Sequence, residues 1–311
     1  MRGELRELVD RSALPPPGGG CTWNRFHALA EASRRSVGVG RLFEAHADAE
    51  AILLEAGRSS VGDLGLLGAW ASDRNSDLRV VEDGSELRLV GQKPFCSGAP
   101  LLDHAVVTAR SAVGVELCLV DLNDPGVCVE RSHWTGLGMR STETRVVRFE
   151  GARCSTVGPT GWYLARPGFW HGAVAVAASW YGGAVGLLDA MVERVDADDL
   201  HQLAHLGEAE ALRWSMEAAL QRGAREIDER SGVDHSVAAR ARALRIRRVV
   251  ADGCLQIVAH AGDSLGPRAL AFDASFSQRI ADLEIYVRQD HGRRDSEQLG
   301  RSVLEQGRLP C

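Results

Sequence analysis

The 311-residue chain is long enough for about two domains with a sizeable core, and its 45% hydrophobic and 25% charged residues are typical of a soluble globular protein. A formal net charge of −6 excludes a whole-chain attraction to nucleic acid or to an anionic membrane surface. Seven cysteines without a C-x-x-C pair, and a start that does not resemble a signal peptide, lead us to expect reduced thiols in the cytoplasm and no metal site.

The first sixty residues divide into two parts. Residues 1–20 end in LPPPGGG, whose prolines and glycines cannot continue a helix or a strand, so we expect a flexible or weakly docked segment there, in which Met1–Arg11 could form one or two charged helical turns. In residues 21–60 apolar side chains recur at helical spacing twice, first from Trp23 and again from Leu42 to a stop at Gly57. This pattern predicts a short helical N-terminal domain.

Residues 61–158 have the pattern of a β domain. Short alternating runs between Gly, Asp, Asn and Pro turns predict strands over Leu78–Val81, Leu87–Val90, Ala105–Ala109, Glu116–Val120, Val127–Glu130 and Arg145–Phe149. The pair Asp83–Gly84 lies between two of these runs and predicts a β-hairpin. Regular spacing without crossover helices predicts an antiparallel barrel or sandwich. A Rossmann site is not expected, because no G-x-G-x-x-G follows a strand.

Residues 159–311 are predicted to be almost wholly helical. Apolar periodicity predicts helices over Phe169–Val192, Leu200–Glu229 and Asp234–Ala261, then from near Phe272 and over Ser296–Glu305. Four long antiparallel helices favour an up-down bundle. The third of them carries an arginine cluster, Arg240–Arg248, which could meet phosphates, although a solvated or subunit-facing side is the favoured interpretation.

The helix over residues 169–192 has little charge and the length of a membrane span. It also contains His171 and Asp189, is rich in alanine and glycine, and has no second span beside it. We therefore favour a helix buried in the bundle, where three glycines let a neighbouring helix approach closely: Gly182, Gly183 and Gly186.

Three segments of the chain resemble one known family. Residues 91–99 carry the pattern G-x-K-x-aromatic-x-[ST]-x-[AG], and the segments Gly68–Asp73 (GAWASD) and Trp134–Thr144 (WTGLGMRSTET) flank it. Together with the order of helices, β domain and bundle, they resemble the acyl-CoA dehydrogenase family from about residue 40 to 300. The resemblance implies an α+β fold with a short helical N-terminal region, a central antiparallel β-barrel or sandwich domain and a C-terminal four-helix bundle.

The resemblance implies FAD as the cofactor. Ser72 near Trp70, and Ser97 near Phe95, match the family's positions beside the flavin ring. Independently of the family, a reducible ring needs hydrogen-bond donors at its edge to stabilise the charge that it gains. Two serines close to large aromatic residues on adjacent strands can supply such donors and a stacking wall.

A second cofactor segment is implied further along the chain. Gln256 and Gly262 match the family's A-x-Q-x-x-G-G-x-G turn, although His260 and Ala261 depart from that pattern. The family's Arg-Phe-Gly segment, which reaches the FAD phosphates across a subunit boundary, corresponds to DADDLHQLAHLG here and lacks both Arg and Phe. We therefore expect reduced cofactor affinity.

Asp290 and His291 are the candidate catalytic residues. In the family a base lies in a D-x-x-x-x-x-x-x-E-G segment, and here Asp282 is followed eight positions later by Asp290, with His291 in place of the glycine. The resemblance implies that this carboxylate takes the α-proton of an acyl thioester while the β-hydrogen leaves as hydride to the flavin. Asp is one methylene shorter than Glu, so His291 is the alternative base, and related flavin monooxygenases use a histidine in this region. A polar helix end that contacts a partner subunit is a further interpretation of the same segment.

The resulting hypothesis is a FAD-dependent oxidoreductase that acts on the CH–CH group of an acyl-CoA or related acyl thioester and assembles as a homodimer or homotetramer. One alternative is a flavin-dependent monooxygenase of the same fold. Another is a non-catalytic partner subunit, because the N-terminal domain is short and the base motif is altered. No nucleic-acid or membrane partner is expected.

Overall fold

The computed structural model describes residues 1–12, 14–131, 133–230 and 237–306. The chain forms two units, which share the helices α3 (Val37–Glu55) and α5 (Gly168–Val192). The β unit consists of Met1–Arg11, Leu42–Thr135 and Arg140–Phe169, and the helical unit consists of Ser12–Arg41, Gly136–Met139 and the chain from Trp170 on. These units differ from the expected boundaries at residues 20, 60 and 158, because the first helix and the larger part of α3 belong with the strands.

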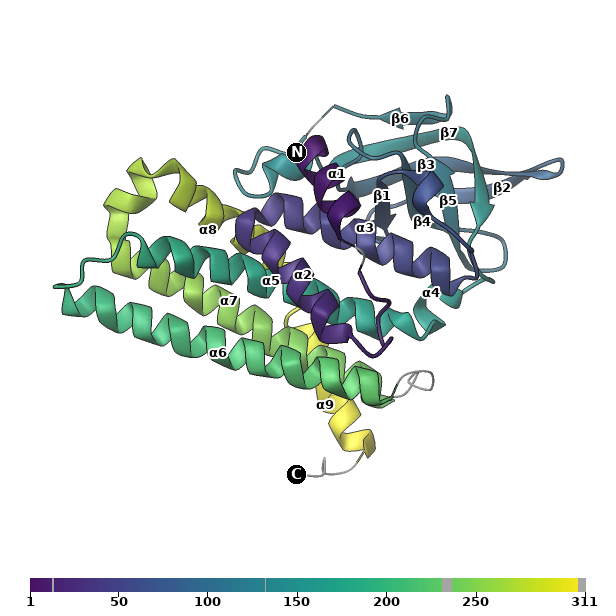
Figure 1. Ribbon diagram of the computed structural model, residues 1–311. Coiled ribbons are helices and arrows are strands. Elements are labelled where there is room, and N and C mark those ends of the chain that lie inside the picture. Colours follow the sequence, from purple (N-terminus) through teal and green to yellow (C-terminus); the bar gives the residue numbers. More distant parts are fainter. Residues whose placement is uncertain (13, 132, 231–236, 307–311) are drawn as a thin grey trace. The chain divides into compact units, whose positions relative to one another are not determined.

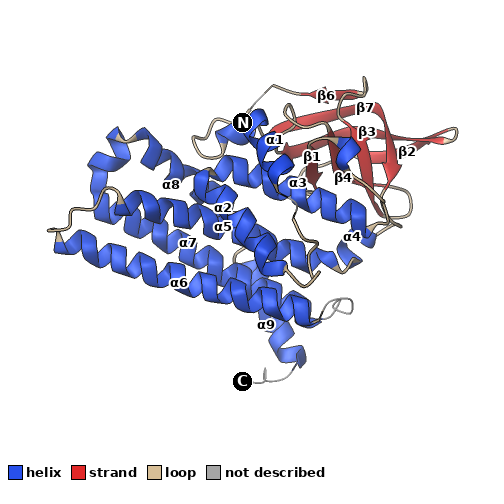
Figure 2. Cartoon of the chain, in the orientation of Figure 1, coloured by secondary structure: helices blue, strands red, loops and turns tan. Residues whose placement is uncertain are grey.

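The strands of the described chain form one seven-stranded sheet in the β unit (Figure 2). They are β1 Leu67–Trp70, β2 Arg79–Asp83, β3 Glu86–Cys96, β4 His104–Arg110, β5 Val115–Asp121, β6 Val127–Val129 and β7 Arg145–Thr156. The pairings run from β4 through β2, β3, β7 and β5 back to β4, while β1 pairs with β4 and β6 with β7. The predicted antiparallel domain is confirmed, with the difference that β4 pairs in parallel with β1 and, at one position, with β2.

The hairpin predicted at Asp83–Gly84 joins β2 to β3. Asp83 lies opposite Glu86, and Gly84 has the positive φ of 65° that such a tight turn needs. The strand predicted over Leu87–Val90 continues through Gly91 to Cys96. Gly91 follows a register shift between β3 and β7 and has a φ of 116°.

The core of the β unit lies between the sheet and the C-terminal half of α3. Its buried side chains come from α3, from the strands and from the segments beside them: Ala49, Ile52, Leu53, Val61, Leu64, Leu67, Val106, Leu117, Leu119 and Val157. The short helix α4 (Trp162–Ala165) covers this cluster with Trp162 and Tyr163.

Residues 2–11 of the expected flexible segment form a helix, α1 (Arg2–Arg11), within the β unit. Leu5 is fully buried, and Arg2 Nη2 lies 2.7 Å from Asp103 Oδ1. The segment is therefore anchored by a buried apolar side chain and by the ion pairs of Arg2 and Arg6 with Asp103.

The helical unit contains α2 (Thr22–Arg35), most of α5, and four further helices: α6 Leu200–Glu229, α7 Val237–Phe272, α8 Ala274–Val287 and α9 Arg293–Gln306 (Figure 1). α7 packs against α6, α8 and α9, and α2 packs against α6. The predicted C-terminal bundle is confirmed, although α7 runs past Ala261 to Phe272 with a kink at Gly266. The predicted start of that helix, residues 234–236, lies outside the described residues.

Two of the three α5 glycines expected to allow a close approach, Gly182 and Gly186, pack against α2, whereas Gly183 faces Leu283 and Val37. A Cβ built on Gly182 would overlap the carbonyl of Ala30, and one built on Gly186 would overlap that of Arg34. Among the described helices α5 has the length and apolarity of a membrane span, and 83% of its apolar window is buried inside the structure. Such burial is typical of a core helix and agrees with the interpretation of α5 as a helix buried in the bundle.

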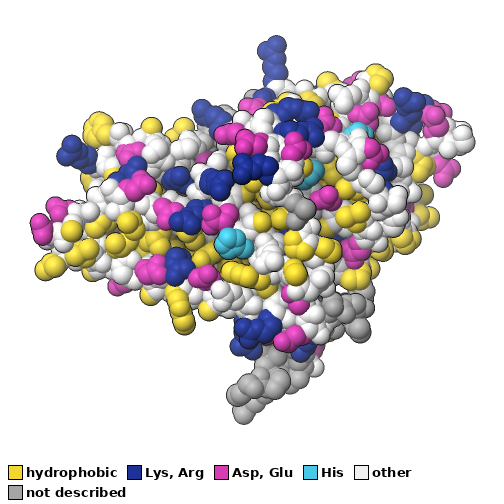
Figure 3. Space-filling view, viewed as in Figure 1, with side chains coloured by type: hydrophobic (Ala, Val, Ile, Leu, Met, Phe, Trp, Pro, Cys, Tyr) yellow, Lys and Arg dark blue, Asp and Glu magenta, His cyan; other side chains and the backbone are white. Residues whose placement is uncertain are grey.

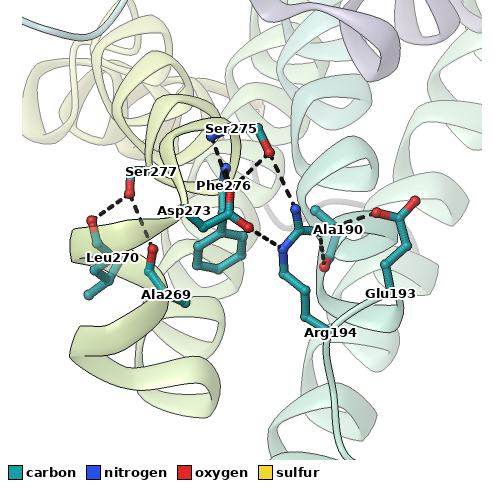
Figure 4. A network of polar contacts seen from close by, with 9 residues as sticks. All are labelled: Ala190, Glu193, Arg194, Ala269, Leu270, Asp273, Ser275, Phe276 and Ser277. Carbon is teal, nitrogen blue, oxygen red and sulfur yellow. Dashed lines mark hydrogen bonds and ion pairs between the residues drawn. The ribbon is translucent and has the colours of Figure 1, made fainter.

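The junction of α7 and α8 is tied to the end of α5 by a polar network (Figure 4). Asp273 caps α8 by accepting from the backbone N–H groups of Ser275 and Phe276, each at 3.0 Å. Its other oxygen accepts from Arg194 Nε at 2.7 Å, and Arg194 also donates to the carbonyl of Ala190 at 2.9 Å. The network fixes the start of α8, the helix whose far end leads to Asp290.

Six cysteines are free in the described part of the chain. Cys96, next to Ser97, is fully buried, and this burial raises the pKa of its thiol well above the usual range. It therefore acts as a packing residue at the end of β3.

Candidate functional site

The end of β3 and the end of β1 meet in the β unit. Trp70 is almost fully buried, and its indole Nε1 donates to the carbonyl oxygen of Ser97 at 3.0 Å. The structure therefore brings the Trp70 side chain to the Ser97 backbone. The expectation that Ser72 and Ser97 belong to adjacent strands is wrong, because β1 pairs with β4, and β4 and β2 lie between β1 and β3 in the sheet. Because the indole is buried, Trp70 positions the backbone of Ser97 and offers no open face for stacking.

Phe95 has the properties of an exposed aromatic platform. It is 51% exposed, and its backbone has a φ of 60°. A non-glycine residue in this region costs about 1–3 kcal/mol, and such strain clusters at functional sites. The strained backbone of Phe95 lies in a register shift between Lys93 and Cys96, which turns the phenyl ring outward.

The Ser97 hydroxyl is arranged as a hydrogen-bond donor. Ser97 is only 8% exposed, and its Oγ accepts from Thr144 Oγ1 at 3.1 Å. Thr144 is in turn 2.8 Å from Thr142 Oγ1, and the Thr142 carbonyl accepts from Gly98 N at 2.8 Å. Since Thr144 supplies the proton between the two hydroxyls, the proton of Ser97 is available to another acceptor.

Ser72 follows β1 and is exposed, and its neighbour Asp73 ties this loop to the sheet. Asp73 Oδ1 accepts from Thr108 Oγ1 at 2.9 Å. Lys93 is completely buried and donates to Thr108 O at 2.8 Å and to Thr108 Oγ1 at 2.9 Å. Burial lowers the pKa of Lys93, and the nearby Asp73 carboxylate, 3.7 Å away, opposes this shift. Sequence reasoning gave Lys93 no role beyond its place in the motif.

Asp290 lies just beyond α8 in the helical unit, and its side chain is only 5% exposed. One carboxylate oxygen forms an ion pair with Arg248 and accepts from Gly292 N at 3.1 Å. The other oxygen, Oδ1, is buried and has no hydrogen-bond partner in the described part of the chain. A buried oxygen of this kind is rare in proteins and marks a candidate functional group.

His291 is the more accessible of the two catalytic candidates, with 65% of its side chain exposed. Its Nδ1 is 3.3 Å from Asp295 Oδ1, and its backbone N–H donates to Asp295 Oδ2 at 3.4 Å. Burial opposes ionisation of Asp295, but its contacts with His291 outweigh burial and lower the pKa of the carboxyl group. An imidazole held by a carboxylate is a common arrangement for moving protons.

Two arginines of α7 are buried, and one of them, Arg247, bonds backbone carbonyls of neighbouring segments. Arg247 donates to Ala173 O at 2.8 Å and to Gln289 O at 2.9 Å, and its guanidinium lies 4.6 Å from the centre of the Trp180 ring. Arg247 therefore holds the residue that precedes Asp290. Arg242 and Arg247 are buried, so this part of the cluster is neither a solvated face nor a phosphate site.

Gln256 and Gly262 lie within α7, so the turn implied at these residues is wrong. Gln256 is exposed, and its Nε2 donates to the Asp252 carbonyl of its own helix at 3.3 Å. The helix breaks later, at Gly266, which has a φ of 66°. The cofactor roles of both residues stay predictions.

The helical unit also has a cavity of about 400 Å³, which the sequence did not indicate. This volume is within the range of small-molecule sites. Figure 3 shows hydrophobic side chains mixed with acidic and basic ones across this face. The lining comes from α2, α5 and α6 and includes Trp23, Phe26, Arg34, Tyr181, Asp189 and Arg213, but not Asp290, His291, Gln256 or Gly262.

The predicted residues thus form two sets. Trp70, Ser72, Phe95 and Ser97 belong to the β unit, and Asp290 and His291 belong to the helical unit. A common cavity for the two sets stays a prediction, because they lie in separate units.

Residues 68–152 match the family model for the acyl-CoA dehydrogenase middle domain. FMN-bound TdsC from Paenibacillus sp. A11-2 is 20% identical with a TM-score of 0.81, covering 99% of this chain and 89% of that one. The methanesulfinate monooxygenase MsuC from Pseudomonas fluorescens is 18% identical with a TM-score of 0.79, covering 94% and 85%. The Tcur3481-Tcur3483 steroid ACAD is 19% identical with a TM-score of 0.75, covering 98% and 89%. No curated protein matches the sequence. The resemblance to acyl-CoA dehydrogenases is therefore confirmed for the fold.

Proposed function

We propose that the protein is a flavin-dependent oxidoreductase whose flavin ring lies against Phe95 and Ser97. The observation that carries this proposal is the strained, exposed Phe95 two residues before a serine hydroxyl whose proton is available. An isoalloxazine ring needs a flat apolar contact on its face and a donor at its edge, and these two side chains fit both needs.

A bound flavin supplies a ring that accepts hydride when oxidised and reacts with oxygen when reduced. Side chains at the ends of β1 and β3 would bind this ring. Ser97 would donate to the edge of the ring and Phe95 would cover one face, while Trp70 fixes the Ser97 backbone. Ser72, exposed beyond β1, is the second proposed donor.

FMN suits the chain better than the FAD expected from the sequence. The segment DADDLHQLAHLG, which runs from residue 196 into the first turns of α6, lacks the arginine and phenylalanine that the family uses for the FAD phosphates. FMN has no adenosine diphosphate part and does not need them. TdsC, of similar fold, was solved with FMN.

Monooxygenation is the reaction that we favour. His291 is exposed and is held by Asp295, so it can deliver or accept a proton beside a substrate. The charge of Asp290 is already balanced by Arg248, which suits a structural role. TdsC and MsuC, which share the fold, are named monooxygenases.

Dehydrogenation of an acyl thioester is the second candidate function, and Asp290 favours it. Its buried Oδ1 has no partner among the described residues and could accept the α-proton that this reaction removes. The substrate would then need to reach a side chain that is 5% exposed. The two candidates thus assign the proton transfer to adjacent residues.

A flavin titration followed by activity assays tests the proposal. The purified protein is first titrated with FMN and with FAD, and a protein that binds neither contradicts the proposal and favours a non-catalytic partner subunit. With a flavin reductase present, labelled oxygen entering dibenzothiophene or methanesulfinate supports the monooxygenase. Anaerobic bleaching of the flavin by an acyl-CoA supports the dehydrogenase.

Two further expectations have their own tests. Light scattering on the same sample tests the homodimer or homotetramer that we propose with this function. Fractionation of the source cells tests a cytoplasmic location.

A further inference from the structure

Three histidines and a glutamate gather where α6 and α7 lie side by side (Figure 1). His201, His205 and Glu208 follow one another on α6 at spacings of four and three residues, which places them on one face of the helix. His260 faces them from α7. All four belong to the helical unit and take no part in the proposed flavin site.

The distances within this group match the spacing of metal ligands. His205 Nδ1 is 3.0 Å from His260 Nδ1, and His260 Nδ1 is 3.3 Å from Glu208 Oε2. Ligand atoms about 2.0–2.2 Å from a tetrahedral Zn²⁺ are separated from one another by about 3.3 Å. One ligand atom from each of His205, Glu208 and His260 lies within 4.8 Å of the others, so a cation needs only small side-chain movements.

His201 has a different role from the three ligands, because it contacts the other ring nitrogen of His205. The two Nε2 atoms are 3.2 Å apart. A proton on His205 Nε2 is donated to His201, which leaves the lone pair on His205 Nδ1 directed toward His260 and Glu208. Outer partners of this kind fix the tautomer of a metal-binding histidine.

The chemistry of the group favours a cation over an anion. Glu208 places a carboxylate beside His260, and it would repel a phosphate. Two imidazoles and one carboxylate, with a position left for water, are a ligand set that Zn²⁺ accepts. Glu208 is 66% exposed and His260 is 20% exposed, so the ligands are partly desolvated while solvent still reaches them.

We propose that His205, Glu208 and His260 bind a divalent transition-metal cation of the Zn²⁺ type, with His201 orienting His205. The bound ion joins α6 to α7 and stabilises the helical unit. The sequence prediction of no metal rested on cysteine spacing and did not weigh histidines four residues apart on a helix.

Calorimetric titration of the tag-free full chain with Zn²⁺ tests the site. We expect one high-affinity ion per chain and a rise of several degrees in Tm when Zn²⁺ exceeds its Kd about a hundredfold. His260→Ala should remove the high-affinity binding. His133→Ala, which changes an exposed histidine of the β unit, is the matched control and should bind Zn²⁺ as the parent does. Unchanged binding in His260→Ala overturns the proposal.

Two further variants keep the test decisive if His260→Ala folds poorly. Glu208→Gln changes an exposed side chain, so it should fold normally and weaken Zn²⁺ at least about tenfold. His201→Gln should weaken it by about 10–100-fold through the lost orientation of His205. If neither variant alters Zn²⁺ binding, or if inorganic phosphate binds here and Zn²⁺ does not, the proposal is wrong. These outcomes are independent of flavin, which is titrated separately.

Discussion

The end of β3 in the β unit and the residues after α8 in the helical unit are fixed by different forces. In the β unit the end of β3 is held by hydrogen bonds between uncharged groups, from Trp70 to the Ser97 carbonyl and from Gly98 to the Thr142 carbonyl. In the helical unit the same task falls to contacts with carboxylates, the ion pair of Asp290 with Arg248 and the hydrogen bond between His291 and Asp295. The difference teaches that the β residues suit holding a ring in one place, whereas the helical residues suit holding and moving protons.

The largest expected effect separates the two catalytic candidates. His291→Ala should slow oxygen transfer about 10²–10⁴-fold, because a positioned acid–base group contributes that much. Asp290→Asn should slow it by less than about tenfold, since the ion pair with Arg248 makes Asp290 structural. The measurement is kcat under saturating flavin. A far larger loss in Asp290→Asn than in His291→Ala would instead support the acyl thioester dehydrogenase.

A packing change should also have a large effect, but on stability alone. In Gly182→Val the new side chain would meet the Ala30 carbonyl of α2, and overpacking of this kind costs about 1–3 kcal/mol or more. Gly207→Ala is the control, since no atom lies within 4 Å of the added Cβ on α6. Urea unfolding of both variants should show a clear loss in the first and no loss in the second. Equal stability would contradict the close contact of α2 with α5.

The stability of the β unit should depend on pH through His46. His46 Nδ1 accepts from Leu67 N at the start of β1, 3.0 Å away, and burial together with the charge of Arg6 lowers the pKa of His46 from 6.5 to about 4. The unfolded chain therefore binds the proton more readily, so stability is lost as the pH falls from about 6.5 to 4, by up to about 3 kcal/mol. His46→Gln keeps an acceptor that does not titrate and should flatten this part of the curve. The same dependence of unfolding free energy on pH in the parent and in His46→Gln would contradict this role of His46.

The smallest effect is expected at the surface of the helical unit. The pKa of Asp273 is lowered to about 2 by the backbone N–H of Phe276, by Arg194 and by Ser275. Its contribution is therefore complete above the usual pKa near 3.8 and is lost as the pH falls toward 2. Asp273→Asn should lower Tm slightly at neutral pH and increase amide exchange at the start of α8. Unchanged exchange there would show that the network in Figure 4 does not anchor the helix.

Most of the fold was predictable because its signals are local. Long apolar periodicity placed α5 and α6 within a residue of their observed ends, and the Asp–Gly pair placed the hairpin of β2 and β3. β1 was missed, because four mostly buried residues show no alternation and the strand depends on parallel pairing with β4. The turn implied by the family motif at Gln256 was wrong, whereas the helix that apolar periodicity predicted through the same residue is present.

The candidate site was predictable in its residue types but not in its contacts. The motif named Ser97, Phe95 and Trp70, but it could not show that Trp70 is buried and that Phe95 is turned outward by a register shift. Pairs such as Asp290 with Arg248 join residues 42 positions apart, and nothing local in the sequence connects them.

The most direct test of the central claim is a flavin-binding titration followed by flavin fluorescence, with FMN and FAD in turn. We predict saturable binding by the parent protein, and at least tenfold weaker binding, about 1.4 kcal/mol, in Ser97→Ala and in Phe95→Ala. Ser85→Ala, which changes an exposed serine of the hairpin, should bind as the parent does. No binding by the parent, or equal affinity in all three variants, would contradict a flavin ring held by Phe95 and Ser97.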